Sequence, residues 1–431
     1  MLKTDPLDRS FGFLKKNLET MPLQKRQDYL NQKLRGIIQY AYRHSIAFKE
    51  KLDSVGLKPK DIQTIKDLEK IPITKKADLV ELQKKNPPFG GLEGVPISEL
   101  KRIYISPGPI YEPGEMEYNE LGWAQGMYAG GFRPGDIVVN TFSYHMVPFA
   151  LHMVDNSLQR IGCVVIPTGV GNTEQQVHIL KTLKATGFCG TPSFLLNIAE
   201  KAVEMGLDPK RDLHLKVGFV AAEMLPESLR ANLEEKFGMV IRQTYGTADI
   251  GCLGYECMKK NGMHIPDDKI VEIVDPETGK QLGPGKTGEI VATSFNKVYP
   301  LIRFGTGDLS ILTETPCPCG RTSPRLIKIL GRVDQVTKVR GLFVHPGQVD
   351  EVASRHSQIG RYQVVVTRKD HKDEMTFRIE LKEEVSQPER LKEEIERTIR
   401  EVIKVRGEVE FIPKGTIPEG GRKIDDQRHW E

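Results

Sequence analysis

The strongest constraint on the fold is an alternation of short apolar runs and helical patterns between residues 135 and 246. The apolar runs are GDIVVN (135–140), GCVVIP (162–167), LKVGFVAA (215–222) and MVIRQTYG (239–246). Segments with apolar residues at helical spacing separate them, such as EQQVHILKTLKATG (174–187). Buried strands that alternate with helices of this length form a parallel sheet covered on both faces. Ligands bind such sheets at the carboxyl ends of the strands, so we expect a site in the loops after GFVAA and RQTYG.

The pattern differs at the two ends of the chain. Residues 1–85 are rich in Lys, Gln and Leu at helical spacing and indicate helices. After residue 265 the apolar period drops toward two, which indicates antiparallel strands in KIVEIVD, GEIVATS and LIRFGTGDLSIL. The last segment alternates strands and helices over about 100 residues, the size of a small separate domain. We therefore predict an α/β protein with a large N-terminal domain, residues 1–332, and a small α+β C-terminal domain, residues 333–431.

The charge balance argues against polyanionic partners. The 62 basic and 58 acidic residues leave a formal net charge of +4, which is too small to indicate binding to nucleic acid or to an anionic membrane. No apolar run reaches the roughly 18 residues of a membrane span, and the N-terminal segment lacks the apolar region of a signal peptide. We expect a cytoplasmic protein. Six cysteines in 431 residues are too few for a disulfide scaffold.

Three motifs together suggest a family. They are YGTAD (245–249), RFGTGDL (303–309) and GRVDQVTKVRG (331–341). In this order and spacing they resemble the core motifs of the adenylate-forming superfamily. The flanking segments are similar to the phenylacetate–CoA ligase family, namely PTGVGNTEQQ (167–176), GTPSFLL (190–196), DPETG (275–279) and HPGQVDEV (345–352).

The resemblance implies both a fold and an activity. The fold is a large domain of mixed and parallel sheets flanked by helices, with a β-barrel-like part, followed by a mobile small domain. The activity is ATP-dependent ligation of an aryl or arylacetic acid to CoA through an acyl-AMP intermediate, with Mg²⁺ as a cofactor. Members of this branch are often homodimers, so a homodimer is expected here too.

The resemblance also assigns nucleotide-binding residues. Asp308 is expected to accept hydrogen bonds from the ribose hydroxyls, for which a carboxylate is well suited. Arg332 is expected near the ribose and phosphate, because a guanidinium offers a planar fork of donors. Tyr245 offers a flat face for adenine. The same motif and the loop that lines the adenine edge contribute Gly246, Thr247, Ala221, Ala222 and Glu223.

Three further positions follow from these motifs. Asp249 stands where the family pattern has Glu and is expected to hold Mg²⁺, for which a carboxylate is a suitable hard ligand. The alternative is that Asp249 caps the N-terminus of a helix. Asp334 corresponds to the hinge on which the small domain turns, and terminal residues of an element can absorb such a rotation. Gly341 corresponds to the loop that reaches the active site for thioester formation.

Two segments depart from the family pattern. The phosphate loop normally reads close to SSGTTGKP, but here it is SPGPIYEP (106–113), whose prolines remove N–H donors. Glu112 falls at the position of the lysine and reverses a charge beside the polyphosphate. Near the C-terminus, IPEGGRKIDDQR (417–428) replaces the Gly-Lys turn of the catalytic lysine. We predict Lys423 in this role, and Arg422 or an exposed tail lysine without a role are the alternatives.

These departures leave two rival functions open. One is adenylyl transfer to another acceptor, as in the relatives that modify a deazaflavin cofactor. The other is an AMP-binding protein that has lost catalysis.

The cysteines indicate a metal site. Cys317 and Cys319 form CPCGR, and Cys257 and His264 lie upstream in CMKKNGMH. Thiolates and an imidazole in two close pairs predict structural zinc with Cys₃His ligation, and the resemblance supports it because some members of this branch carry such a zinc. The C-x-C spacing is tighter than the usual C-x₂-C, so unrelated free thiols remain the alternative.

An aromatic segment is the candidate wall of the acyl pocket. The resemblance places the organic acid beside the strand ends, where FSYHMVPF (142–149) supplies Tyr144, His145 and Phe149. A partly apolar, aromatic wall suits an aryl or arylacetic acid. The alternative is that these residues belong to the core.

Overall fold

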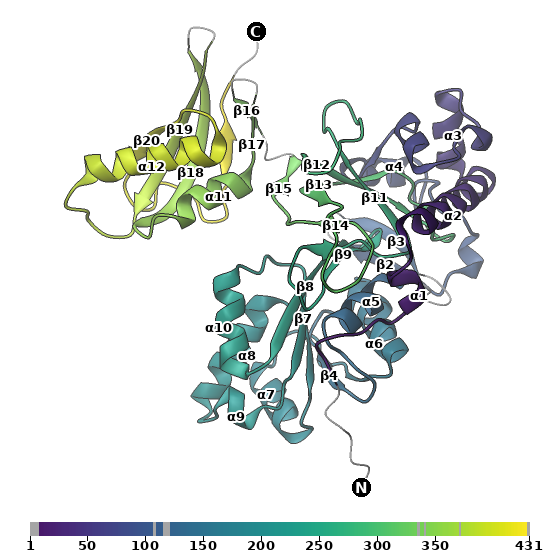
Figure 1. The fold of residues 1–431 in the computed structure, drawn as a ribbon, viewed down its shortest axis with the longest axis horizontal. Helices are drawn as coiled ribbons and strands as arrows, with labels where there is room; N and C mark the ends of the chain where they lie inside the picture. The colour runs from purple at the N-terminus through teal and green to yellow at the C-terminus, as the bar shows by residue number, and fades with distance from the viewer. Residues whose placement is uncertain are drawn as a thin grey trace. The chain divides into compact units, whose positions relative to one another are not determined.

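The computed structural model describes residues 8–106, 109–114, 121–333, 337–339, 342–369 and 372–428 (Figure 1). The chain divides into two compact units. The first comprises Met1–Thr306 and Ile311–Lys328, and the second comprises Gly307–Ser310 and Ile329–Glu431. The predicted boundary after residue 332, as the limit of a mobile domain, stays a prediction.

The first unit begins with the predicted helices. They include α1 (Lys16–Glu19), α2 (Leu23–His44), α3 (Ile46–Ser54) and α4 (Leu79–Lys85). Helix α2 buries Leu34, Ile37, Ile38 and Ala41, which recur at helical spacing on one face and pack in a shared core with α3.

The alternating segment forms the predicted parallel sheet. Its strands are β4 (Ile137–Asn140), β5 (Val164–Ile166), β6 (Gly187–Gly190), β7 (Val217–Val220) and β8 (Val240–Thr247). They lie in the order β8-β7-β6-β4-β5, and each neighbouring pair is parallel. The intervening helices are α6 (Asn156–Ile161), α7 (Thr173–Thr182), α8 (Pro192–Glu204), α9 (Pro209–Asp212) and α10 (Glu227–Phe237). Figure 1 shows α7, α8 and α10 beside these strands.

The central strands β4, β6 and β7 are almost entirely buried, as the apolar runs predicted, whereas the edge strand β5 leaves Val164 exposed. Val138 and Val139 are adjacent in β4 but belong to two different core clusters. The first cluster packs against a π-helix, Phe149–Asp155, and against α6. The second packs against α7, α8 and α10. The connection from β4 to β5 is π-helical over Phe149–Asp155 before it continues as α6, and this uncommon geometry is frequent at functional sites.

An antiparallel region continues the same sheet beyond β8. Its strands are β9 (Gly251–Glu256), β10 (Met263–His264), β11 (Lys269–Val274), β12 (Thr287–Ser294), β13 (Phe304–Thr313) and β14 (Arg325–Leu326). The order β11-β12-β13-β14-β10-β9-β8 makes one mixed sheet, which confirms the predicted α/β class. A separate hairpin joins β2 (Arg102–Ser106) to β3 (Ile110–Gly114).

The second unit has the predicted α+β composition. Its elements are β15 (Gly331–Arg332), β16 (Thr337–Val339), β17 (Leu342–Val344), α11 (Pro346–Ser354), β18 (Ile359–Lys369), β19 (Lys372–Leu381), α12 (Pro388–Ile403), β20 (Glu408–Phe411) and β21 (Ile424–Asp426). Four strands form a sheet in the order β20-β19-β18-β21. Helix α12 buries Leu391, Ile395, Ile399 and Ile403, spaced four residues apart, in this unit's core.

Candidate functional site

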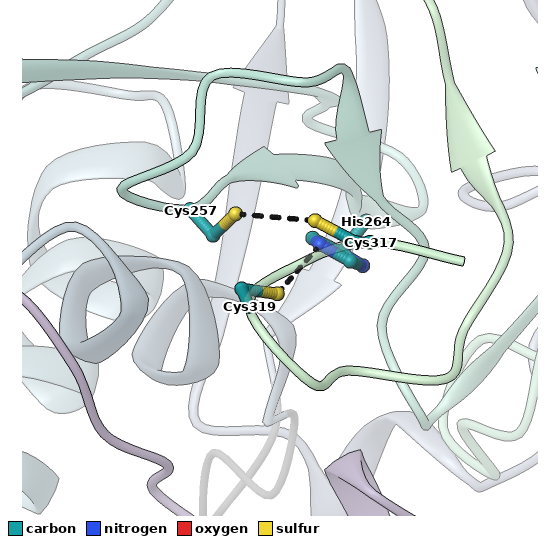
Figure 2. A group of neighbouring side chains, drawn as sticks. All are labelled: Cys257, His264, Cys317 and Cys319. Atoms are coloured by element: carbon teal, nitrogen blue, oxygen red, sulfur yellow. Dashed lines mark hydrogen bonds between the residues drawn. The ribbon is translucent and has the colours of Figure 1, made fainter. Parts of the chain in front are cut away.

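The four predicted zinc ligands lie together (Figure 2). Cys257 follows the end of β9, His264 belongs to β10, and Cys317 and Cys319 lie in the loop between β13 and β14. The Cys257 and Cys317 sulfur atoms are 3.8 Å apart, and His264 Nε2 is 3.3 Å from Cys319 Sγ. All four side chains are buried, and their ligand atoms lie within 4.8 Å of one another.

This geometry fits a tetrahedral zinc ion. Zn–S bonds of about 2.3 Å place two sulfur ligands about 3.8 Å apart, whereas a disulfide brings them to about 2.05 Å. Hydrogen bonds from Cys257 and His264 lower the pKa of the Cys319 thiol and favour its thiolate, the form that binds metal. The hydrogen bond to Cys319 raises the pKa of the Cys257 thiol, and burial raises that of Cys317, so the metal-free cluster favours a single thiolate. His264 Nδ1 lies 3.3 Å from the Ser323 hydroxyl, which leaves Nε2 directed at the cluster. Four protein ligands leave no open position for catalysis.

The residues predicted to surround adenine lie at the carboxyl ends of β7 and β8. Tyr245 is near the end of β8, and its hydroxyl donates to Thr306 Oγ1 at 3.3 Å. Gly246 lies so close to β9 that a Cβ at this position would come within 2.4 Å of the Gly251 carbonyl oxygen. Thr247 is the last residue of β8.

The loop after β7 carries the other adenine-side residues. Ala221 is buried, whereas Ala222 is exposed with a φ of +70°, a left-handed conformation that is costly for a residue with a side chain. Such strain is found most often at functional sites. The Glu223 carboxylate accepts hydrogen bonds from the Ser193 hydroxyl at 2.8 Å and the Ser193 backbone N–H at 3.2 Å. Glu223 is therefore held against the N-terminus of α8.

Asp308 and Arg332 form an ion pair, although they are 24 residues apart in the sequence. They are direct partners in the register of β13 and β15, and Arg332 Nη1 lies 3.4 Å from Asp308 Oδ1. Gly307 has a φ of +78°, and a Cβ there would lie 2.9 Å from an Arg332 guanidinium nitrogen. The left-handed backbone at this position of β13 therefore favours glycine beside this pair. Asp334 and Gly341 lie outside the described residues.

Asp249 lies in the turn between β8 and β9 and forms an ion pair that the sequence did not predict. Lys76 Nζ is 2.6 Å from Asp249 Oδ2. The alternative that Asp249 caps a helix is wrong, because strand β9 follows the turn. No local signal identifies Lys76, which stands in a lysine pair after β1 (Thr74–Lys75).

Part of the altered phosphate loop is a β-hairpin. Ser106 ends β2, and residues 110–113 belong to β3, while residues 107 and 108 lie outside the described ranges. The strand alternation turns Ile110 and Glu112 to the buried side and leaves Tyr111 exposed. Burial, and then the charge of Asp249, raise the pKa of Glu112 to about 8.

Lys423 lies just before β21, and its side chain is partly exposed. Its ammonium is 3.4 Å from Asp350 Oδ1 and 3.9 Å from the centre of the Tyr362 ring. The Tyr362 hydroxyl donates to the same Asp350 oxygen at 2.8 Å. Lys423 is therefore held on an aromatic face within the second unit, whereas Arg422 is exposed.

The three candidate acyl-pocket residues separate into two groups. Tyr144 and Phe149 are half-buried against the first core cluster. The Tyr144 hydroxyl donates to the Asp155 carboxylate at 3.0 Å, and the Phe149 ring packs edge-on against Trp123 with ring centroids 4.8 Å apart. His145 is exposed, so the structure does not bring it to this wall.

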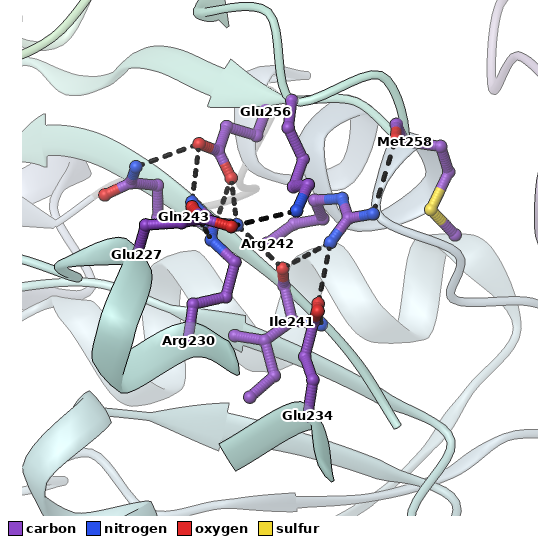
Figure 3. A network of polar contacts seen from close by, with 9 residues as sticks. Glu227, Arg230, Glu234, Ile241, Arg242, Gln243, Glu256 and Met258 are labelled. Atoms are coloured by element: carbon purple, nitrogen blue, oxygen red, sulfur yellow. Dashed lines mark hydrogen bonds and ion pairs between the residues drawn. The ribbon is translucent and has the colours of Figure 1, made fainter. Parts of the chain in front are cut away.

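A buried network anchors the strand that carries Tyr245 (Figure 3). The Arg230 guanidinium donates to both Glu256 carboxylate oxygens, at 2.7 and 2.9 Å. Gln243 donates to the same carboxylate through its backbone N–H at 3.1 Å and its side-chain amide at 2.8 Å. Glu256 precedes Cys257 of the Cys/His cluster, so the network joins α10, β8 and β9 beside that cluster.

Within the part of the chain that the structure describes, no helix is both long and apolar enough to cross a membrane.

Comparisons with known proteins agree with the motifs. Residues 118–296 match the family model of AMP-binding enzymes, and residues 341–428 match that of the AMP-binding enzyme C-terminal domain. The chain is 33% identical to phenylacetate-coenzyme A ligase of Thermus thermophilus, over 95% of this chain and 98% of the relative. It is 30% identical to the protein of the same name from Aromatoleum evansii, over 94% and 96%. A solved structure of 2-hydroxyisobutyryl-CoA ligase with 2-HIB-AMP and CoA superposes with a TM-score of 0.87 at 27% identity, covering 98% of this chain and 96% of that one.

Proposed function

The chain belongs to the phenylacetate–coenzyme A ligase family, and from this membership we propose that it joins an aryl or arylacetic acid to coenzyme A. It is an AMP-forming acid–thiol ligase. The acid carboxylate attacks the α-phosphorus of ATP and releases pyrophosphate, and the CoA thiol then displaces AMP from the acyl-AMP. The observation that carries the proposal is the placement of Tyr245 near the end of β8 and of Glu223 after β7, at the carboxyl edge of a parallel sheet.

The first step joins two anions, so the protein must position them and neutralise charge. In this proposal Asp308 binds the ribose hydroxyls, and Arg332 lies beside the ribose and phosphate. Tyr245 stacks on adenine, with Gly246, Thr247, Ala222 and Glu223 around it. Mg²⁺, held by Asp249, supplies charge neutralisation at the phosphates when it is bound. Lys76 contacts Asp249 through Oδ2, so the other carboxylate oxygen, Oδ1, is the one open to a cation.

The second unit supplies the remaining groups. Lys423 is proposed to contact the carboxylate and the α-phosphate, for which it must leave Asp350 and the Tyr362 ring. A hinge at Asp334 and a CoA-side loop at Gly341 belong to the same proposal. So do a homodimeric state and a cytoplasmic location.

The aromatic specificity rests on Tyr144 and Phe149. Phe149 packs between Trp123 and Phe142, with its ring centroid 4.5 Å from that of Phe142. A wall of this kind favours a planar, apolar acid. The cluster of Cys257, His264, Cys317 and Cys319 is proposed to hold structural zinc, supported by the tetrahedral spacing of its sulfur atoms.

The substrate class is tested by measuring CoA thioester formation with ATP and a panel of acids. Phenylacetate and benzoate represent the proposed class, and 2-hydroxyisobutyrate represents the small hydroxy acid in the name of the structural neighbour. We expect the aryl acids to give thioester at the higher kcat/KM. A preference for 2-hydroxyisobutyrate would contradict the aromatic specificity but not the ligase chemistry.

The same assay separates the two rival functions. Pyrophosphate release without CoA consumption favours adenylyl transfer to another acceptor, such as a deazaflavin cofactor. AMP binding without pyrophosphate release across the whole panel favours an AMP-binding protein without catalysis.

A further inference from the structure

Three charged side chains from distant parts of the first unit share one buried region. Lys76 comes from the turn after β1, Glu112 from β3, and Asp249 from the turn between β8 and β9. Lys76 Nζ contacts Asp249 Oδ2 at 2.6 Å. After burial itself, the charges of Asp249 and Glu112 are the largest causes of the raised pKa of the Tyr299 phenol. Both carboxylates thus act electrostatically on the same buried ring, and the charges of Asp249 and Lys76 also act on the Glu112 carboxyl.

The carboxylate oxygens in this cluster are incompletely bonded. Among the described residues, neither Glu112 oxygen has a hydrogen-bond partner, and neither does Asp249 Oδ1. Glu112 is only 3% exposed, and the Asp249 side chain is fully buried. The Ser106 hydroxyl on the neighbouring strand favours the charged form of Glu112 but does not reach hydrogen-bond geometry. Buried polar atoms without partners are uncommon and point to a missing proton, water or ion.

The charges point to an ion. One ammonium faces two carboxylates, so a negative charge remains uncompensated when both are ionised. The proposed function brings the polyphosphate of ATP to this region, where a bare carboxylate in place of lysine would repel it. A cation held between the carboxylates and the phosphates turns that repulsion into attraction. Mg²⁺ is bound in this manner, through one or two carboxylates, phosphate oxygens and water.

We propose that Glu112 is a second carboxylate ligand, with Asp249, for the divalent cation that enters with ATP. This inference rests on the proposed function. It explains how the chain tolerates Glu112 at the position where the family pattern has a lysine. The positive charge that the lysine supplies elsewhere is supplied here by the bound cation.

Lys76 is expected to oppose cation binding at this site. Its ammonium neutralises Asp249 at Oδ2 while the cation is absent, and its positive charge repels a cation at the neighbouring, unpartnered Oδ1. Removal of the ammonium therefore favours a divalent cation in the protein without nucleotide. A lysine that served only to bind phosphate would have no such effect on a metal ion alone.

The test measures Mn²⁺ binding to the full chain by electron paramagnetic resonance, first alone and then with ATP in the absence of any organic acid. Glu112→Gln is expected to weaken Mn²⁺ binding with ATP at least about tenfold, the lower end of the loss caused by removing groups that support a metal site. Asp249→Asn should weaken it similarly. Lys76→Gln should strengthen the binding of Mn²⁺ alone. Glu81→Gln, at an exposed ion pair on α4, is the matched control and should bind like the unchanged protein.

Glutamine has the size of a protonated glutamate, so Glu112→Gln is expected to fold. If Glu112→Gln does not fold, Lys76→Gln tests the same site, because it should strengthen the binding of Mn²⁺ instead of weakening it. Wild-type Mn²⁺ affinity in folded Glu112→Gln would make Glu112 a buried protonated carboxyl and overturn the inference. Unchanged or weaker binding of Mn²⁺ alone in Lys76→Gln would overturn it as well. Because Mn²⁺ binding needs no turnover, failure of the ligase assay leaves this result interpretable.

Discussion

Replacement of Arg230 by methionine tests whether the buried network stabilises the strand that ends in the Tyr245 motif. Arg230 and Glu256 are both almost fully buried and form a two-pronged ion pair. Arg230→Met leaves the Glu256 carboxylate buried with only the two Gln243 donors. A buried charge that loses its partner destabilises strongly, so the variant should unfold more easily than the unchanged protein.

The size of the effect follows from the burial. Removal of one partner of a buried ion pair costs about 3–5 kcal/mol. For a unit of more than 250 residues, a change of 1 kcal/mol shifts the melting temperature by roughly 2 °C, so the expected drop is about 6–10 °C. Arg211→Met is the matched control, because Arg211 pairs with Asp212 at the surface and such pairs contribute about 0–1 kcal/mol.

The assay is thermal unfolding followed by circular dichroism, with retained zinc checked in each variant. The double variant Arg230→Met, Glu256→Leu removes both charges and should recover much of the loss, because neither charge is then left unpaired. The reasoning is refuted if Arg230→Met melts no lower than Arg211→Met. It is also refuted if the double variant is destabilised by the sum of the two single changes.

Three further predictions concern the metal cluster, the buried glutamate and the lysine of the second unit. Protein purified without added metal should contain stoichiometric zinc by elemental analysis. Cys317→Ser should lose this zinc, whereas the core variant Cys163→Ser should keep it. A zinc content unaffected by Cys317→Ser would contradict the ligand set. The pKa of Glu112 is raised from 4.5 to about 8, so the stability that its proton contributes is fully present below pH 4.5 and is lost as the pH rises to 8. Without added divalent cations, the unchanged protein should therefore lose stability relative to Glu112→Gln across this window, whereas a constant difference in melting temperature contradicts the shift. Lys423→Ala should slow pyrophosphate exchange by about 100-fold or more, as loss of a transition-state donor does, and Arg422→Ala should have little effect; equal losses would contradict the choice of Lys423.

The fold was predictable where local patterns carry the information. Strands β4, β6 and β7 are almost entirely buried, so their residues form apolar runs that can be recognised without knowing their neighbours. Helix α12 can also be recognised from its own sequence, because its buried apolar residues recur four positions apart. Strand β21 was missed because its residues, IDD, carry almost no apolar signal, and it forms by pairing with β18.

The candidate site was predictable only in part, for a related reason. The grouping of the four Cys and His side chains could be predicted because cysteine and histidine are distinctive residue types, although Cys257 and Cys317 are 60 residues apart. Lys76 and Asp249 are 173 residues apart, and neither residue type is unusual at a surface, so their ion pair had no sequence signal. The buried orientation of Glu112 depends on the pairing of β2 with β3, which the prolines of SPGPIYEP obscured.

The central claim is that this chain activates a carboxylic acid as its acyl-AMP. The direct measurement is isotope exchange between pyrophosphate and ATP, with phenylacetate as the acid and Asp308→Ala as the variant that lacks the ribose ligand. The account predicts exchange that requires the acid and falls sharply in Asp308→Ala. Exchange that is absent with every acid tested, in protein that still binds AMP, would contradict it.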